Sequence, residues 1–239
     1  TLRHPETIRA LMRSKASNWH VSFNREIPLD LSLRIASGNA SVTLSDTHLT
    51  ALRSKVGSGR FAATLNGSMD ALEHVALKTA SGKTQAVLNG TFDKLTDYAV
   101  SSASGRVALA LGGSFPALDV MDVKTASGTV DLGLAGEYPA LERISIDTVS
   151  GTGTLNFVDA AFSNVTLVLN CVSGAHVVRC PTDVGVGLRF KSLTGRLEAP
   201  GFDRVEGMFV NELYGKTETT MEISVSSISG RVSVQLGNA

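Results

Sequence analysis

Three acidic side chains recur at one place in a repeated sequence, and their spacing makes them the best candidates for chemistry. Glu73, Asp119 and Glu142 each lie nine residues before a glycine, and Thr96 holds the same place in the copy between the first two. If the copies stack, the carboxylates form a line that could bind a cation or sugar hydroxyls, as the acid clusters of sugar-processing solenoid enzymes do. Two basic residues nearby would neutralise this line, namely Lys94 and Arg143. A solvated corner is therefore the favoured interpretation.

The other residue types that could catalyse a reaction or bind a metal lack partners at useful spacing. No Gly-x-Ser-x-Gly elbow, P-loop or dinucleotide fingerprint is present. Serines beside glycines are typical of turns, and no base accompanies them. The histidines lie in different repeats without metal-ligand spacing: His4, His20, His48, His74 and His176. We expect His176 to be a hydrogen-bonded core residue. The sequence thus predicts no catalytic, cofactor-binding or metal-binding residue, and a protein that is not an enzyme.

The elements that must position these residues are set by a repeat of 23 residues. Its clearest copies are Ala80-Ser81-Gly82, Ala103-Ser104-Gly105, Ala126-Ser127-Gly128 and Val149-Ser150-Gly151. Similar Ser-Gly pairs continue in both directions, at Ser58-Gly59 and at Ser173-Gly174. A repeat of this length is typical of solenoids, propellers or arrays.

Apolar residues alternate on both sides of each glycine, which predicts two half-buried strands per repeat. A second corner follows, with residues such as Asn66-Gly67-Ser68 that tolerate a tight turn. Two ladders are expected to fill the core beside that corner: Met69, Phe92, Phe115, Tyr138 and Leu72, Leu95, Leu118, Leu141.

Two architectures fit this alternation. An antiparallel meander would need about 18 strands in one sheet, with a single apolar face left uncovered, and open sheets rarely exceed about 10 strands. If each repeat is instead one rung, its two strands face each other across a shared core. We therefore predict an all-β fold, a flattened parallel β-solenoid of about nine or ten rungs.

The ends of the chain are less regular than its middle. Residues 1–28 are expected to form an N-terminal cap, with a short helix near residues 5–14 and a strand from Trp19 to Phe23. The solenoid domain then spans residues 29–239 and loosens after residue 180. A protruding hairpin is expected within residues 205–222, and the last rung near the C-terminus could present an open edge.

Composition excludes several classes of partner. The chain carries 22 basic and 22 acidic residues, so its overall charge gives no indication of nucleic-acid or anionic-membrane binding. No stretch approaches about 18 consecutive apolar residues, so we expect no direct insertion into a membrane. Cys171 and Cys180 fall near opposite ends of one repeat and are predicted to be free and buried.

Two segments resemble a known family. Residues 19–31 (WHVSFNREIPLDL) and 36–44 (ASGNASVTL) are similar to the opening of the toast-rack domains of unknown function. The repeats also resemble candidate adhesin domains of bacterial surface proteins, including regulators of the cell-wall antibiotic response. The resemblance covers about residues 19–180 and offers no catalytic residues.

This resemblance implies a non-enzymatic protein of the cell surface or extracellular space. It could be an adhesin that binds a surface protein or glycan, or a structural subunit of a filament. The open last rung would allow a homo-oligomer to grow head to tail. The alternative is the ectodomain of an envelope or cell-wall stress regulator that binds a membrane partner.

Overall fold

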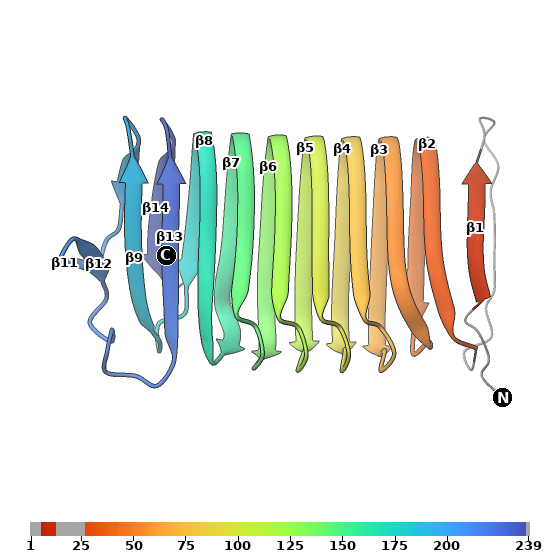
Figure 1. Ribbon diagram of the computed structural model, residues 1–239, viewed down its shortest axis with the longest axis horizontal. Coiled ribbons are helices and arrows are strands. Elements are labelled where there is room, and N and C mark those ends of the chain that lie inside the picture. The colour runs from red at the N-terminus through yellow and green to blue at the C-terminus, as the bar shows by residue number, and fades with distance from the viewer. Residues whose placement is uncertain (1–5, 13–26, 238–239) are drawn as a thin grey trace.

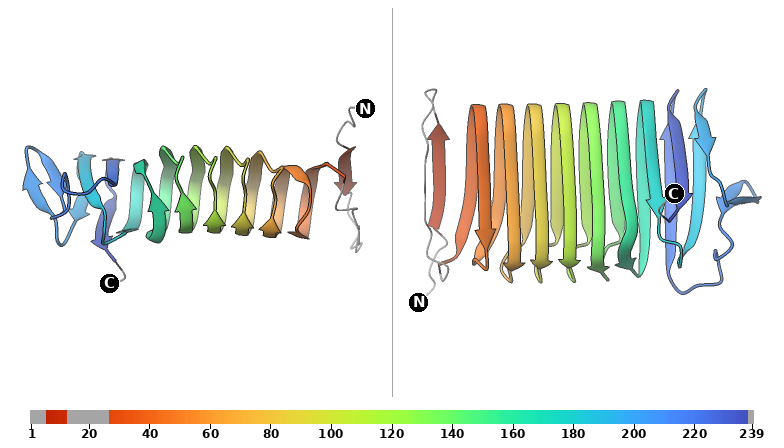
Figure 2. Two further views of the ribbon diagram at one scale, coloured as in Figure 1. Left: turned by 90° about the horizontal axis from the view of Figure 1, so that it is seen from below. Right: turned by 180° about the vertical axis from the view of Figure 1, so that it is seen from behind.

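The computed structural model describes residues 6–12 and 27–237 and shows a flattened parallel β-solenoid (Figure 1, Figure 2). Within those residues all regular secondary structure consists of β-strands. Seven long strands each form one complete rung: β2 (Leu29–Ser45), β3 (Leu49–Ser68), β4 (His74–Thr91), β5 (Asp97–Ser114), β6 (Val120–Tyr138), β7 (Arg143–Phe162) and β8 (Asn164–Cys180). The predicted all-β solenoid is confirmed. The count of nine or ten rungs was too high, because the last copies of the repeat are divided into shorter strands.

Each rung rises along one face, bends at its Ser-Gly pair and returns along the opposite face (Figure 1). The bends form one edge of the solenoid, which we call the Ser-Gly edge. The connections between rungs form the opposite edge, which we call the loop edge. Neighbouring rungs pair in parallel and, in the middle of the solenoid, in steps of one repeat, so that Gly82 pairs with both Gly59 and Gly105.

Glycine is required at each bend for two reasons that Gly105 illustrates. Its φ is 120°, in a region that residues with a side chain rarely adopt. A Cβ at this position would also lie 1.9 Å from the carbonyl oxygen of Gly82 in the preceding rung. The rungs therefore stack at this edge only if the residue at the bend has no side chain, which is why the repeat is visible in the sequence.

The alternating apolar residues of both half-strands point into one core, as predicted. Tyr98, Val107 and Val130, for example, are at most 1% exposed. The two ladders beside the loop edge are also buried, and their aromatic rings stack: the centroids of Phe92 and Phe115 are 4.9 Å apart. Neighbouring strands are about 4.8 Å apart, so the rings stack because the rungs do.

The N-terminal helix predicted near residues 5–14 is wrong. Residues 6–12 form a strand, β1 (Glu6–Met12), which pairs in parallel with the first half of β2. Ile8, Ala10 and Met12 alternate as a strand requires, while Ile8, Leu11 and Met12 also fit a helix. So short a helix is marginal in water, whereas the edge of β2 offers hydrogen-bond partners to a strand. The strand predicted from Trp19 to Phe23 lies outside the described residues.

The C-terminal strands do not stack in sequence order. They are β9 (Gly185–Ser192), β10 (Arg196–Glu198), β11 (Asp203–Val205), β12 (Met208–Val210), β13 (Thr220–Ser227) and β14 (Arg231–Leu236). β13 and β14 together form the layer on β8, and β9 and β10 form the layer beyond it. The chain therefore skips one position after β8 and returns to fill it (Figure 1).

This order corrects the prediction that the last rung of the sequence ends the solenoid. The outermost strands at this end are β12 and β11, an antiparallel hairpin that pairs with part of β9. A hairpin is thus present at this end, but it spans residues 203–210 and overlaps only the first part of the predicted range of 205–222, whose last three residues belong to β13. Both cysteines are free and buried, as predicted. No membrane-spanning helix occurs in residues 6–12 or 27–237.

Candidate functional site

The acidic line identified in the sequence exists as a backbone ladder at the loop edge. The amide of Thr96 donates to the carbonyl oxygen of Glu73 at 3.0 Å, and the amide of Asp119 donates to Thr96 at 3.2 Å. Glu142 continues the ladder with a bond of 3.1 Å to Asp119. All four side chains are exposed. The part of the chain that the structure describes contains no group of three or more side chains placed to hold a metal ion.

His176 lies in the core, as expected from its inward position. It is 1% exposed, and its Nε2 lies 3.1 Å from the hydroxyl of Thr148. The ring fits against Gly153 of the preceding rung, where a Cβ would lie 2.4 Å from Nδ1. Burial lowers the pKa of His176, because the charged imidazolium is poorly solvated there. His176 is therefore a neutral structural residue at pH 7.

This histidine makes the stability of the solenoid depend on pH. In the unfolded chain it titrates near its ordinary pKa of about 6.5, while in the folded chain its pKa is lower. The unfolded state thus binds more protons between the two values, and stability falls as the pH drops below about 6.5. His176→Val should flatten this dependence, because valine occupies the paired position of the next layer, Val232. Urea unfolding of both proteins at about pH 7.5 and about pH 5 measures how much unfolding free energy each loses between the two pH values. An equal loss in the two proteins would contradict the prediction.

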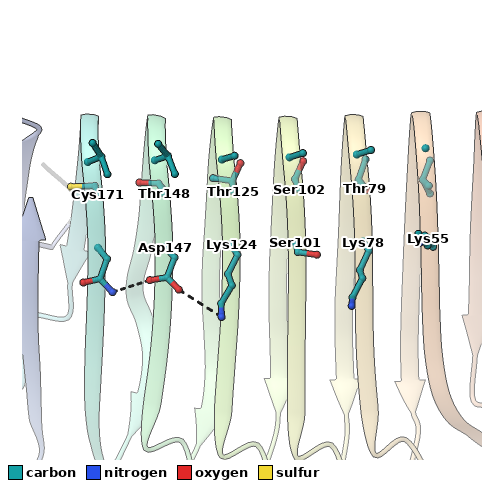
Figure 3. Close-up of a pocket in the computed structure, with 18 of the residues that line it drawn as sticks. Lys55, Lys78, Thr79, Ser101, Ser102, Lys124, Thr125, Asp147, Thr148 and Cys171 are labelled. Carbon is teal, nitrogen blue, oxygen red and sulfur yellow. Dashed lines mark hydrogen bonds and ion pairs between the residues drawn. The ribbon is translucent and has the colours of Figure 1, made fainter.

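A groove of about 1140 Å³ runs across the rungs close to the Ser-Gly edge. Three consecutive residues of every layer from β2 to β8 and of β13 line it, namely those four, three and two places before the glycine of the bend. The residues three places before the glycine form its floor, which over β4 to β8 consists of Thr79, Ser102, Thr125, Thr148 and Cys171 (Figure 3). Those two places before it are small over the first rungs: Ala36, Gly57, Ala80, Ala103 and Ala126. The small residues leave the groove open.

The hydroxyl groups of the floor serve the bend. Ser102 Oγ donates to the carbonyl oxygen of Ser104 at 3.1 Å, and Thr125 Oγ1 donates to that of Ser127 at 3.2 Å. Thr79 bonds the hydroxyl of Thr84 across the core. These bonds satisfy buried polar groups where each rung turns. They give the serines and threonines of the floor a structural role.

The residues four places before the glycine form a row along one side of the groove, and its charge changes along the solenoid (Figure 3). The row is basic over the first rungs: Arg34, Lys55, Lys78 and, after Ser101, Lys124. Lys124 Nζ lies 3.8 Å from Asp147, which also accepts a bond of 2.8 Å from Asn170. Lys55 and Lys78 form no salt bridge within the described residues. We call Arg34, Lys55, Lys78 and Lys124 the first cationic row.

A second row of cations lies just beyond the bend, one place after the glycine. Arg60, Lys83 and Arg106 hold this place on three consecutive rungs. Arg106 pairs with Asp131 at 2.6 Å, and Arg60 donates to the side chain of Gln85 at 3.3 Å. Across β2 to β6 the two rows offer ten positions, of which seven are basic and none is acidic. We call Arg60, Lys83 and Arg106 the second cationic row.

The far half of the groove carries exposed apolar residues along one side. Val149, Val172 and Ile228 lie two places before the bend on β7, on β8 and just after β13, and they are 54%, 42% and 48% exposed. The amide of Ile228 bonds the carbonyl of Cys171, which places its layer directly on β8. The groove therefore combines a basic half with a half whose exposed residues are apolar on one side and polar on the other, where Asp147, Asn170 and Ser226 lie.

Sequence reasoning missed the groove, although the signal was present. The overall charge is zero, so composition showed no basic surface. The same alignment on the turn glycines that revealed the strands would also have shown lysine and arginine recurring at two fixed positions.

One family model matches the first part of the chain. Residues 2–87 match the family model described as the N-terminal domain of toast_rack. Three members of the first cationic row lie in this matched region, namely Arg34, Lys55 and Lys78.

One solved structure is similar over most of the chain. It is a candidate cell adhesion protein from Clostridium sporogenes ATCC 15579, with 11% identity and a TM-score of 0.28, and the match covers 93% of this chain and 67% of that one. Among curated proteins no match was found.

Proposed function

We propose that this toast-rack chain is a non-enzymatic binding protein of the cell surface or extracellular space, in the adhesin class, and that the groove is its binding surface. The observation that supports this function is the construction of the groove from equivalent positions of eight stacked layers, β2 to β8 and β13. A surface that repeats at every rung suits an extended ligand better than a compact small molecule, which is usually held in an enclosed pocket.

Two features support a binding role over catalysis. The hydroxyl groups of the floor bond to the bend of each rung, as at Ser102 and Thr125. The acidic line at the loop edge is exposed and lies on the edge opposite the groove. A catalytic site normally combines a nucleophile or acid with a partner that tunes it in a sheltered place.

The filament form of the proposal is less favoured. End-to-end growth would have to use the β9 end, where the hairpin β11–β12 and the side chain of Asn211 already occupy part of the edge. Asn211 accepts from the amide of Val186 at 2.8 Å and donates to the carbonyl of Val184 at 2.8 Å. Short outer strands and charged residues such as Asp203 and Arg204 are typical devices against edge-to-edge pairing.

A second candidate function is the ectodomain of an envelope-stress regulator. The observation that favours it is the apolar side of the far half of the groove, where Val149, Val172 and Ile228 are exposed on adjacent layers. Exposed apolar residues that lie together often mark contacts with another protein. This function would place the interface at β7 and β8 rather than over the cationic rows.

The proposed function is tested by location and by adhesion. Protease added to intact cells of the source organism should digest the chain, and purified chain should co-sediment with washed envelopes from those cells. A chain found only inside protease-treated cells would overturn the proposal. Release of sugar fragments from the envelopes by the purified chain would contradict the non-enzymatic part.

A further inference from the structure

The charge of this chain is zero overall but is separated between the two edges of the solenoid. The cationic rows flank the Ser-Gly edge over β2 to β6. Exposed acids gather around the loop edge: Asp46, Asp70, Glu73, Asp93, Asp97, Asp119, Glu137, Glu142 and Asp159. Among residues 27–237, two basic residues lie beside these acids, Lys94 and Arg143. One edge therefore carries a positive field although composition suggests none.

The first cationic row stacks like charges on neighbouring rungs. Arg34, Lys55 and Lys78 occupy equivalent places on β2, β3 and β4. Neighbouring strands are about 4.8 Å apart, so these cations repel one another at every step. Elsewhere on the surface a cation pairs with an acid of the neighbouring rung, as Arg53 does with Asp30 at 2.6 Å. A ligand that carries negative charges at a similar spacing would remove the repulsion.

We infer that the basic half of the groove binds an acidic polysaccharide, in extended form, along the first cationic row. This inference rests on the proposed function and names the class of ligand for it. The carboxylates or sulfates of the polymer would lie beside Lys55 and Lys78, which are exposed and have no salt-bridge partner among residues 27–237. The second cationic row adds to the field that attracts the polymer.

The shape and chemistry of the groove favour a polysaccharide over other extended anions. In an extended peptide, side chains on the same face are about 6.8 Å apart, which does not match the spacing of the rungs. Single-stranded nucleic acids need aromatic side chains on which the bases stack, and none of the residues that line the groove is aromatic. An extended sugar chain advances by about one rung spacing per residue, so its charges stay in step with the rungs even where only alternate residues face the groove.

A second copy of the chain is a less suitable occupant. Its acidic loop edge is two sheets wide, roughly 10 Å before side chains are counted. The groove lies on one face, between the first cationic row and small residues such as Ala80 and Ala103. A groove of this kind admits a single chain more readily than a broad edge.

Binding of defined polymers to the purified full chain tests the inference. We expect heparin and polygalacturonate to bind in calorimetric titrations at about 50 mM salt and neutral dextran not to bind. The double variant Lys55→Gln with Lys78→Gln should bind the acidic polymers at least about tenfold more weakly, and its affinity should depend less on salt, with a slope smaller by about two. The control is Lys94→Gln with Lys216→Gln, which removes two exposed lysines far from the groove and should bind as the unchanged protein does.

Four results would overturn the inference. One is equal affinity of the Lys55 and Lys78 double variant and the unchanged protein. Another is binding of neutral dextran as tight as that of polygalacturonate, since charge would then be irrelevant. A third is binding of poly-L-glutamate as tight as that of polygalacturonate, since the site would then recognise charge alone. The fourth is self-association in sedimentation velocity, without polymer, that the double variant abolishes.

The same variants separate this inference from the proposed function. If the double variant still co-sediments with envelopes as the unchanged protein does, the chain is an adhesin whose site lies elsewhere. If the unchanged protein binds acidic polysaccharide but protease cannot reach it on intact cells, the inferred ligand class is supported and the proposed surface location is wrong.

Discussion

Gly105→Ala is expected to destabilise the solenoid by more than about 4 kcal/mol, a loss that few single substitutions cause. Two effects add at this position. An L-residue at a φ of 120° is strained by about 1–3 kcal/mol. The new methyl group would also lie 1.9 Å from the oxygen and 2.8 Å from the carbon of the Gly82 carbonyl. Those are backbone atoms held in the ladder between β4 and β5, so they can move only if the rungs separate.

Two other glycines separate these effects. Gly38 shares the unusual backbone with a φ of 117°, but a Cβ there would have no atom within 4 Å among the described residues. Gly133 has neither feature, since its φ is ordinary and the space around it is open. Urea unfolding followed by circular dichroism should rank the alanine variants Gly133, Gly38, Gly105 in order of increasing loss. Equal urea midpoints for the alanine variants of Gly105 and Gly133 would show that the added methyl group does not clash with the Gly82 carbonyl at the bend.

The bend explains why the middle of the fold could be predicted from the sequence. A residue that must be glycine once per rung leaves a fixed mark every 23 residues, and the apolar alternation can be aligned on it. The stacked ladders follow from the same alignment, since Phe92 and Phe115 occupy equivalent places one repeat apart. The register of the bends, the core and the two edges over β3 to β8 are consequences of this spacing.

The N-terminal strand could not be distinguished from a helix by pattern alone. In residues 6–12, Ile8, Ala10 and Met12 fit a strand while Ile8, Leu11 and Met12 fit a helix. What decides between them is the unpaired edge of β2, which is a property of the folded solenoid and not of the segment. Backbone pairing from Leu29 to Ile35 satisfies groups that a helix would leave to water.

The order of the C-terminal layers was equally hidden. β9 and β13 both offer an apolar alternation, with Val186 and Leu188 in one and Met221 and Ile223 in the other. Either could stack on β8 by this criterion. The buried Asn211, which bonds the outer edge of β9, shows why β9 is the outer strand. Such a contact depends on a turn whose position in space the sequence does not reveal.

The groove shows that aligning the repeats on their glycines reveals a pattern of charge that the net charge does not. Residues such as Lys55 and Lys78 are 23 positions apart and look unrelated along the chain. Stacking brings them to neighbouring strands and makes a continuous positive surface. In repeat proteins, therefore, outward-facing positions carry information about partners that the overall composition averages away.

Phe115→Ala is expected to cost about 3–5 kcal/mol, because the side chain is fully buried and its loss leaves a cavity that stacked rungs cannot close. Its ring lies between those of Phe92 and Tyr138, with centroid distances of 4.9 Å and 5.0 Å. Phe115→Met is the matched control, since Met69 holds the equivalent place on an earlier rung. Methionine should refill most of the space and cost less than about 1.5 kcal/mol.

Double variants show whether the ladder acts as a stack or as separate core residues. In Phe92→Ala with Phe115→Ala the losses should not add, because the first substitution has already removed the stacking partner of the second, worth about 0.5–1.5 kcal/mol. In Met69→Ala with Tyr138→Ala the two sites are three rungs apart with no common neighbour in the ladder, and the losses should add within about 0.5 kcal/mol. Urea unfolding of the single and double variants measures both sums. Additive losses in both pairs would mean that the rings contribute by burial alone and that their stacking adds nothing.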